Sequence, residues 1–423
     1  MKKPLVMLLA GGGGTRLGVL VKHRAKPAVP FGGRYRIIDF ALSNVMHAEL
    51  DHAGVLTQYK PLSLMEHIGV GEAWNLYGHL RGVHTLPPRT GEADSDWYQG
   101  TADAIWQNMD FMKAMKPERV LVLSGDHIYR MDYQRMVAEH VSRKADVSIA
   151  VMDVAAEDVS RFGMIWADGE GSITRFEEKP ARADTRLASM GIYVFEWPCL
   201  VEALERIVAT RIGNDFGHDI MPRLLGPKRM LVHRFDGYWR DVGTISSYFQ
   251  ANMDLLRPSS GLDLDRWEIG TRDDPRQVGD RPPVRFGTAA SCDQVLVSDG
   301  CRIDGRVRRS VLSPDVTVEA GAEVEDAILM HGVVIRRGAV VRRAVLDKGV
   351  ILGAGARILG GSKAAPNAEY AKCQLDGLSV LGKDVQVPDG VSLGANVVCE
   401  SGAGGGDFKG DVPDGATVRA SGE

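Results

Sequence analysis

A glycine-rich loop near the N-terminus holds the residues with the clearest capacity for chemistry. Residues 10–17 read AGGGGTRL and follow the apolar run 5–9, whose pattern predicts a buried parallel strand. Four consecutive glycines let backbone N–H groups approach a ligand closely, and Arg16 adds a fixed positive charge. The chain stays basic through Lys26 and has no acidic residue before Asp39, which predicts a polyphosphate site. It is not a Walker A loop, because no Gly-Lys-Ser/Thr closes it.

Two carboxylates occur where such a site would need a cation. Asp126 follows the apolar run 120–123, and Asp241 lies in the segment YWRDVGT. Carboxylate oxygens suit Mg²⁺, which takes one or two of them and completes its shell with substrate phosphates. A lone turn aspartate is more often a helix cap, so either residue alone indicates little. Their occurrence together with Arg16 and Lys26 favours a metal-assisted phosphate site.

Two further segments have the residue types that bind sugars. In FEEKP, Lys179 could contact a phosphate and Glu178 could accept hydrogen bonds from hydroxyl groups, although a solvated charged turn is the commoner explanation. Trp97 and Tyr98 precede a predicted helix that Thr101 would cap. This aromatic pair suits stacking on a sugar or a base, or anchoring in the core.

The elements that must position these groups alternate between strands and helices over residues 1–255. This alternation predicts a Rossmann-like α/β domain with a mixed, mostly parallel sheet and a ligand site beyond the carboxyl ends of its strands. A Pro- and Asp-rich linker is expected over 256–290. Predicted strands cover 53–57, 119–124, 147–152, 189–195 and 230–234, and predicted helices cover 102–115, 132–143 and 199–207.

An internal repeat defines the C-terminal third of the chain. Residues 310–326, 327–343 and 344–360 follow one another in the same frame, and 379–395 repeats it after an insertion. Short apolar runs with a glycine at a fixed position predict a parallel β-helix with one coil per repeat, and the repeat resembles the left-handed hexapeptide β-helix. We expect this domain over 291–423, with a loosely ordered glycine-rich tail from Ser401.

Charge and composition exclude several classes of protein. The 423 residues carry a net charge of −4, which argues against a nucleic-acid binder. No apolar stretch is long enough to span a bilayer, and we expect no membrane partner. The five cysteines show no CxxC pairing, so they are expected to be reduced thiols in a cytoplasmic protein.

Taken in order, these segments resemble the ADP-glucose pyrophosphorylases (glucose-1-phosphate adenylyltransferases) of the bacterial type. The resemblance covers nearly the whole chain and implies synthesis of ADP-glucose and pyrophosphate for glycogen (alpha-glucan) synthesis. It also implies a homotetramer and a sugar-phosphate activator. The matching segments include AGGGGTRL, RAKPAVPFGGRYRIIDFALSN, LTQYK, WYQGTADA, SGDHIYRMDY, FGM, FEEKP, ASMGIYVF, DFGHDIMP and YWRDVGT.

The resemblance assigns a role to each candidate residue. Arg16, Lys26 and Asp126 would be catalytic and act on the ATP phosphates, and Asp126 and Asp241 would bind Mg²⁺. An allosteric effector would contact His23, Arg24 and Arg36. ATP would contact Leu9, Ala10, Gly11, Gly12, Gly14 and Thr15, and glucose 1-phosphate would contact Tyr98, Gly163, Glu178, Lys179 and Ser189.

Some positions depart from the family pattern and keep alternatives open. His23 stands where some relatives have an activator-binding lysine, and Pro30 replaces a nearby histidine. Arg89 and Thr90 stand where many relatives have glutamines thought to face the base, so a thymidylyl- or uridylyltransferase is the first alternative. A non-catalytic regulatory subunit and a hexapeptide acyltransferase using His331 are further alternatives.

Overall fold

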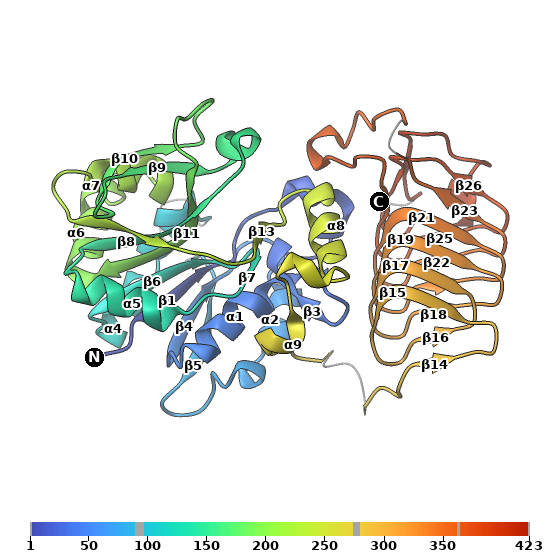
Figure 1. Ribbon diagram of the computed structural model, residues 1–423, viewed down its shortest axis with the longest axis horizontal. Coiled ribbons are helices and arrows are strands. Elements are labelled where there is room, and N and C mark those ends of the chain that lie inside the picture. The colour runs from blue at the N-terminus through green and yellow to red at the C-terminus, as the bar shows by residue number, and fades with distance from the viewer. Residues whose placement is uncertain (1, 89–96, 274–279, 362–363, 422–423) are drawn as a thin grey trace.

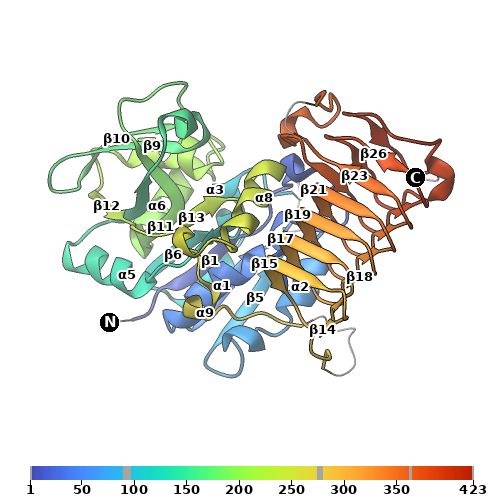
Figure 2. The same cartoon turned by 45° about the vertical axis from the view of Figure 1, so that its right-hand side comes forward.

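The computed structural model describes residues 2–88, 97–273, 280–361 and 364–421 and contains an α/β domain followed by a domain of stacked parallel strands (Figure 1). Helix α8 (Ile245–Asp254) lies between the two domains in both views (Figures 1 and 2) and contacts strands β17 (Arg306–Leu312) and β19 (Glu323–Leu329). No helix within the described ranges is long and apolar enough to cross a bilayer.

The α/β domain is built on a nine-stranded sheet with the order β10-β9-β11-β6-β1-β4-β5, and β8 and β12 continue it beside β11. Strands β6, β1, β4 and β5 are parallel, as are β8 and β12, whereas β11 is antiparallel to its neighbours. The predicted mixed, mostly parallel sheet is therefore confirmed. The strands are β1 (Leu5–Leu9), β4 (His52–Leu56), β5 (Gly82–Leu86), β6 (Arg119–Ser124), β8 (Val147–Asp153), β9 (Gly163–Ala167), β10 (Ile173–Glu178), β11 (Leu187–Glu196) and β12 (Met230–Arg234).

Helices cover both faces of this sheet because each central strand is apolar on both sides. Val120 and Val122 of β6 face one buried core, and Leu121 and Leu123 face the other. The helix predicted over 102–115 is two helices, α3 and α4. The helices other than α8 are α1 (Ile37–His47), α2 (Leu62–Ile68), α3 (Thr101–Trp106), α4 (Met109–Met115), α5 (Tyr133–Ser142), α6 (Trp197–Ile207), α7 (Met221–Leu224) and α9 (Leu264–Trp267).

Two short strands bring distant segments together beside the sheet. Strand β7 (His127–Tyr129) pairs antiparallel with β13 (Trp239–Asp241), and the register places Asp241 opposite His127. The Trp239 side chain is buried and packs edge-on against the His127 ring, with centroids 5.0 Å apart. This pairing fixes the position of Asp241 relative to the carboxyl end of β6.

The second domain stacks parallel strands in two continuous sheets, with its apolar side chains pointing inward. Register pairs Ala327 with Ala344 and Ala344 with Ser379, so each predicted repeat is one coil, consistent with a hexapeptide-repeat left-handed β-helix. Its strands are β14 (Arg285–Phe286), β15 (Ser291–Val297), β16 (Arg302–Ile303), β17, β18 (Thr317–Val318), β19, β20 (Val334–Ile335), β21 (Val340–Leu346), β22 (Ile351–Leu352), β23 (Arg357–Leu359), β24 (Ser379–Leu381), β25 (Gln386–Val387), β26 (Ser392–Leu393), β27 (Val398–Cys399) and β28 (Thr417–Val418).

Two expectations about this half of the chain need correction. The tail after Ser401 is not loosely ordered over residues 401–421, because β28 pairs with β27 and Val418 is buried in the β-helix core. Within the expected linker 256–290, helix α9 packs its Trp267 ring edge-on against Phe40, and β14 already pairs with β16. Apolar side chains at regular coil positions therefore order the tail despite its glycines.

Candidate active site

A cavity of about 530 Å³ opens at the carboxyl ends of β1, β4 and β6. The last residue of each strand, Leu9, Leu56 and Ser124, lines it. Ligand sites of open α/β sheets lie at this edge, as the sequence predicted. The rest of the lining includes Ala10, the glycines 11–14, Thr15, Arg16, Lys26, Gln58, Tyr59, Tyr98, Gln99, Gly100, Thr101, Asp126, Asp215 and Gly243.

The glycine loop needs its glycines for close packing as well as for conformation. Gly14 has a φ of +57°, and a Cβ there would lie 2.7 Å from the Cβ of Lys26. A Cβ on Gly11 would lie 3.2 Å from the Cβ of Gln58. A side chain at position 14 would push the loop away from Lys26, and one at position 11 would press against Gln58. The next segment is the 3-10 helix η1 (Thr15–Val21), which carries the exposed Arg16.

Lys26 lies between the two predicted metal-binding carboxylates. Its Nζ is 2.8 Å from Oδ2 of Asp126 and 3.2 Å from Oδ1 of Asp241. Burial of Lys26 would lower its pKa, but the two carboxylates outweigh this effect and raise it. Burial would likewise raise the pKa of Asp126 and of Asp241, yet Lys26 holds both below the usual range. All three groups are therefore charged near neutral pH.

The carboxylates also fit a divalent cation. Ligand atoms of Asp126, His127 and Asp241 all lie within 4.8 Å of one another. Two hard oxygen donors suit Mg²⁺, and an imidazole nitrogen is a softer third donor. Sequence reasoning missed His127, although it directly follows Asp126 in the chain. Only the pairing of β7 with β13 places Asp241 against it.

Arg16 lies on the same side of the cavity as Asp241. A Cβ on Gly243 would lie 2.9 Å from Nη2 of Arg16 and 2.9 Å from both carboxylate oxygens of Asp241. Because Gly243 has no side chain, the Arg16 guanidinium and the Asp241 carboxylate can both lie beside it. Arg16, Lys26 and Asp126 line the cavity, and Asp241 lies next to them beside Gly243.

Tyr98 is anchored in the protein, which is one of the two alternatives left open for it, whereas Thr101 differs from the sequence expectation. The hydroxyl of Tyr98 donates to the backbone carbonyl of Leu86 (2.9 Å) and accepts from Asn108 (3.0 Å), so this phenol is anchored in the protein. Thr101 is not the N-cap of α3, because Gly100 holds that place. Its hydroxyl instead donates to Asp215 (2.9 Å) and accepts from the Phe216 N–H (3.0 Å).

Gln58 and Gln99 line the cavity, but the sequence analysis gave neither a role, although they lie in the family-like segments LTQYK and WYQGTADA. Gln58 Oε1 accepts from the Tyr98 N–H at 3.1 Å, which ties the loop after β4 to the loop before α3. The aromatic rings of Tyr59 and Trp97 lie 5.9 Å apart, and both are about half exposed. These side chains give the mouth of the cavity an amide and an aromatic surface.

Four of the five residues expected to bind the sugar phosphate form a second group on or directly after β9, β10 and β11, whereas the fifth, Tyr98, lines the cavity. Lys179 Nζ lies 2.6 Å from Oε1 of Glu178, and a Cβ on Gly163 would lie 2.7 Å from Oε2 of Glu178. Ser189 is buried and accepts from the Gly191 N–H at 3.2 Å. None of these four residues lines the 530 Å³ cavity. Glu178 nevertheless approaches it at Gly217, where a Cβ would lie 2.4 Å from Oε2 of Glu178 and 3.5 Å from Oδ1 of Asp215.

The residues expected to bind an effector lie at the domain interface. Buried Arg24 donates to Oδ1 of buried Asp347 in the β-helix at 2.8 Å. Arg36 donates to the carbonyl and hydroxyl oxygens of Ser63 (2.8 and 3.2 Å), and His23 is exposed. Burial and the cations Lys348, Arg281, Arg36 and Arg24 hold the pKa of His331 well below its usual value. Arg89 and Thr90 lie outside the described residues.

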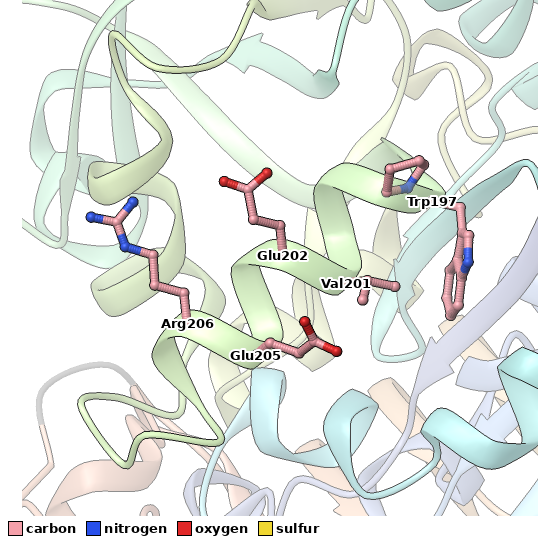
Figure 3. Close-up of a pocket in the computed structure, with 6 residues that line it drawn as sticks. Trp197, Val201, Glu202, Glu205 and Arg206 are labelled. Carbon is pink, nitrogen blue, oxygen red and sulfur yellow. The ribbon is translucent and has the colours of Figure 1, made fainter.

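A second hollow lies on the outer surface of α6 and is lined by Trp197, Pro198, Val201, Glu202, Glu205 and Arg206 (Figure 3). None of the predicted site residues lines it. Its Glu202 pairs with Lys228 at 2.6 Å, which explains that carboxylate as a surface ion pair.

Comparisons with known proteins agree with this arrangement. The family model "Nucleotidyl transferase" matches residues 5–257, and the model "GlmU-like, C-terminal hexapeptide" matches residues 282–373. A curated protein of Bacillus cytotoxicus named glucose-1-phosphate adenylyltransferase is 47% identical over 332 residues, covering 78% of this chain and 87% of that protein. Proteins of the same name from Bacillus anthracis and Bacillus mycoides are 47% and 46% identical over 335 residues, and each alignment covers 78% of this chain and 88% of the relative.

Proposed function

The chain belongs to the glucose-1-phosphate adenylyltransferase family of nucleotidyl transferases, and from this we propose that it transfers the adenylyl group of ATP to α-D-glucose 1-phosphate. The products are ADP-glucose and pyrophosphate. The observation that carries the proposal is the contact of Lys26 with Asp126 and Asp241 beside the glycine loop, at the carboxyl edge of the sheet. Loop N–H groups, two cations and two carboxylates are what a triphosphate with a divalent cation requires.

The reaction needs alignment and charge stabilisation more than covalent help from the protein. A phosphate oxygen of glucose 1-phosphate attacks the α-phosphorus of ATP, and the bond to the pyrophosphate leaving group breaks. The attacking phosphate is already anionic, so no general base is required. Lys26 and Arg16 balance charge on the α-phosphate and on the leaving pyrophosphate. Mg²⁺, held by Asp126 and Asp241, would supply further charge neutralisation when bound.

The second group of residues suits the sugar phosphate. Lys179 offers a flexible ammonium for its phosphate, and Glu178 can accept hydrogen bonds from its hydroxyl groups. We propose that Gly163 and Ser189 complete this part of the site. We also propose that the ring of Tyr98, held in place by the hydrogen bonds of its hydroxyl group, lines the sugar-phosphate site. Because Glu178 approaches the cavity at Gly217, a sugar phosphate held there would lie next to a triphosphate on the glycine loop.

The choice of base is tested by comparing nucleotides. Purified protein with glucose 1-phosphate and Mg²⁺ is given ATP, dTTP or UTP, and pyrophosphate release is measured. We expect ATP to give the highest kcat/KM. Preference for dTTP or UTP would instead favour the thymidylyl- or uridylyltransferase alternative, and no release with any nucleotide would favour a regulatory subunit.

We also propose the finer properties that the family suggests. The enzyme is cytoplasmic, takes part in glycogen synthesis and forms a homotetramer. A sugar phosphate activates it by binding at His23, Arg24 and Arg36. The five free cysteines support a reducing compartment. Exposed apolar side chains over residues 62–80, including Leu62, Val70 and Leu80, support self-association. Activity assays with several sugar phosphates test the activation, and a measurement of the molecular mass in solution tests the homotetramer.

A further inference from the structure

We infer that Tyr370 and Cys373, in the insertion that interrupts the β-helix repeat, are positioning residues for Arg16. The insertion lies between β23 and β24 and contains the 3-10 helix η7 (Ala371–Cys373). Helix η7 packs on η1, which carries Arg16, although more than three hundred residues separate them. This inference rests on the proposed function, because it concerns how Arg16 is aligned for the triphosphate.

The contact is made at a point where η1 departs from helical geometry. Gly18 has φ +54° and ψ −128°, a conformation that side-chain-bearing residues rarely adopt. A Cβ on Gly18 would lie 3.2 Å from Sγ of Cys373 and 3.2 Å from the ring of Tyr370. The insertion therefore packs directly on the backbone two residues after Arg16.

A second contact links the same insertion to the other side of the site. The N–H of Ser246 donates to the backbone carbonyl of Gln374 at 3.1 Å. Ser246 lies in the first turn of α8, which directly follows the segment that contains Asp241 and Gly243. A few residues of the insertion therefore contact both the segment that carries Arg16 and the segment that carries Asp241.

Shared packing makes this link rigid. The side chains of Leu375 and Leu378 are buried in one core with Leu17 and Leu20 of η1 and with Ile245 of α8. Tyr370 is tied further to the β-helix, because its hydroxyl lies 3.4 Å from Oε1 of Glu400. Since the Arg16 side chain is exposed, its place opposite Asp241 depends on the backbone of η1. The β-helix domain thus helps to set the phosphate-binding geometry of the other domain.

The test compares Tyr370→Ala and Tyr370→Leu with wild-type protein and with Tyr370→Phe. The first two remove the ring that rests on Gly18, and we expect each to raise KM for ATP about tenfold, because small displacements of a positioned group are costly. KM for glucose 1-phosphate should change by less than about twofold, because Lys179 lies on other elements. Tyr370→Phe keeps the ring on Gly18 and loses only the 3.4 Å hydroxyl contact with Glu400, so both KM values should stay within about twofold of wild type. Hydrogen exchange should accelerate in Thr15–Val21 in both ring-removing variants.

Val387→Ala is the control for a general loss of β-helix stability, because Val387 is buried in the β-helix core, more deeply than the partly buried Tyr370, and lies away from η1. It should lower the unfolding temperature without changing either KM or the exchange of η1. The inference is overturned if the ring-removing variants leave KM for ATP and η1 exchange unchanged, or if they affect both KM values equally. Wild-type protein that makes no ADP-glucose would contradict the proposed function instead, and the exchange comparison would still test the contact.

Discussion

The Nζ of Lys26 lies 2.8 Å from Oδ2 of Asp126, a contact between residues one hundred positions apart in the chain. Asp126 ends the segment after β6, and Lys26 begins the short helix η2 (Lys26–Ala28) that follows η1. Their meeting unites the basic N-terminal segment with the carboxyl edge of the sheet. It also shows how the buried Lys26 ammonium keeps a partly buried carboxylate ionised.

Replacing Asp126 tests the charge balance of the site. We expect Asp126→Asn to fold normally, since Lys26 keeps Asp241 as a partner, and to lose about 10²- to 10³-fold in kcat, the size found for one electrostatic stabiliser. Pyrophosphate release measures the rate, and circular dichroism checks the fold. Asp236→Asn, at an exposed turn, is the control and should keep full activity. Near-native turnover of Asp126→Asn would show that this carboxylate has no catalytic role.

Metal binding at Asp126, His127 and Asp241 can be measured without turnover. Mn²⁺ titration followed by electron paramagnetic resonance should give one site per chain, which Asp241→Asn weakens at least about tenfold. His127→Ala should weaken it as well, because the ring contributes a donor to the cluster. Chelator should abolish activity, and added Mg²⁺ should restore it. Full activity in excess chelator would contradict the metal assignment.

Lys179 is proposed to contact glucose 1-phosphate and not ATP. Lys179→Ala should raise KM for glucose 1-phosphate far more than KM for ATP, because it removes a cation from one substrate only. Initial rates with each substrate varied in turn give both values. The exposed Lys113 of α4 is a matched control, and Lys113→Ala should change neither KM value. If Lys179→Ala raised both KM values equally, Lys179 would not be a specific ligand of the sugar phosphate.

His331 predicts a pH dependence of stability. Burial and the surrounding cations keep it neutral in the folded protein, whereas the unfolded chain takes up a proton below about pH 6.5. The unfolded state then binds more protons, so stability falls as pH drops from about 7 to 5.5, by up to about 1.4 kcal/mol per pH unit for one group. His331→Gln should flatten this slope in urea unfolding. The remaining slope comes partly from His140, whose pKa burial lowers to about 4. An unchanged slope would mean that His331 does not stay neutral.

Much of the fold and of the catalytic end of the site could be predicted because short-range patterns specify them. The apolar run before Asp126 is β6, and the repeat frame of residues 310–360 reappears as strand register. Asp126 lies at the sheet edge as expected, because a carboxylate after a central strand must lie there, whereas Asp241 reaches it through the pairing of β13 with β7.

The parts that could not be predicted depend on contacts between distant segments. Arg24 pairs with Asp347, 323 residues away, a contact that nothing near Arg24 in the sequence indicates. Nothing near Gly18 in sequence indicates that Tyr370 packs on it. Thr101 is a residue type that often caps helices, but Gly100 is the N-cap here, and the Thr101 hydroxyl donates a hydrogen bond to Asp215 instead. At these positions the contacts with distant residues determine the structure, and they override the preference that the local sequence indicates.

Transfer of the adenylyl group with release of pyrophosphate sends the α-phosphate and the γ-phosphate of ATP into different products. The most direct measurement gives the enzyme glucose 1-phosphate and Mg²⁺ with ATP labelled at the α-phosphate or at the γ-phosphate, and follows each label. We predict that the α label appears in ADP-glucose and the γ label in pyrophosphate, and that Asp126→Asn slows both together. Transfer of the γ label to the sugar phosphate, or α label that stays in ADP, would contradict the account.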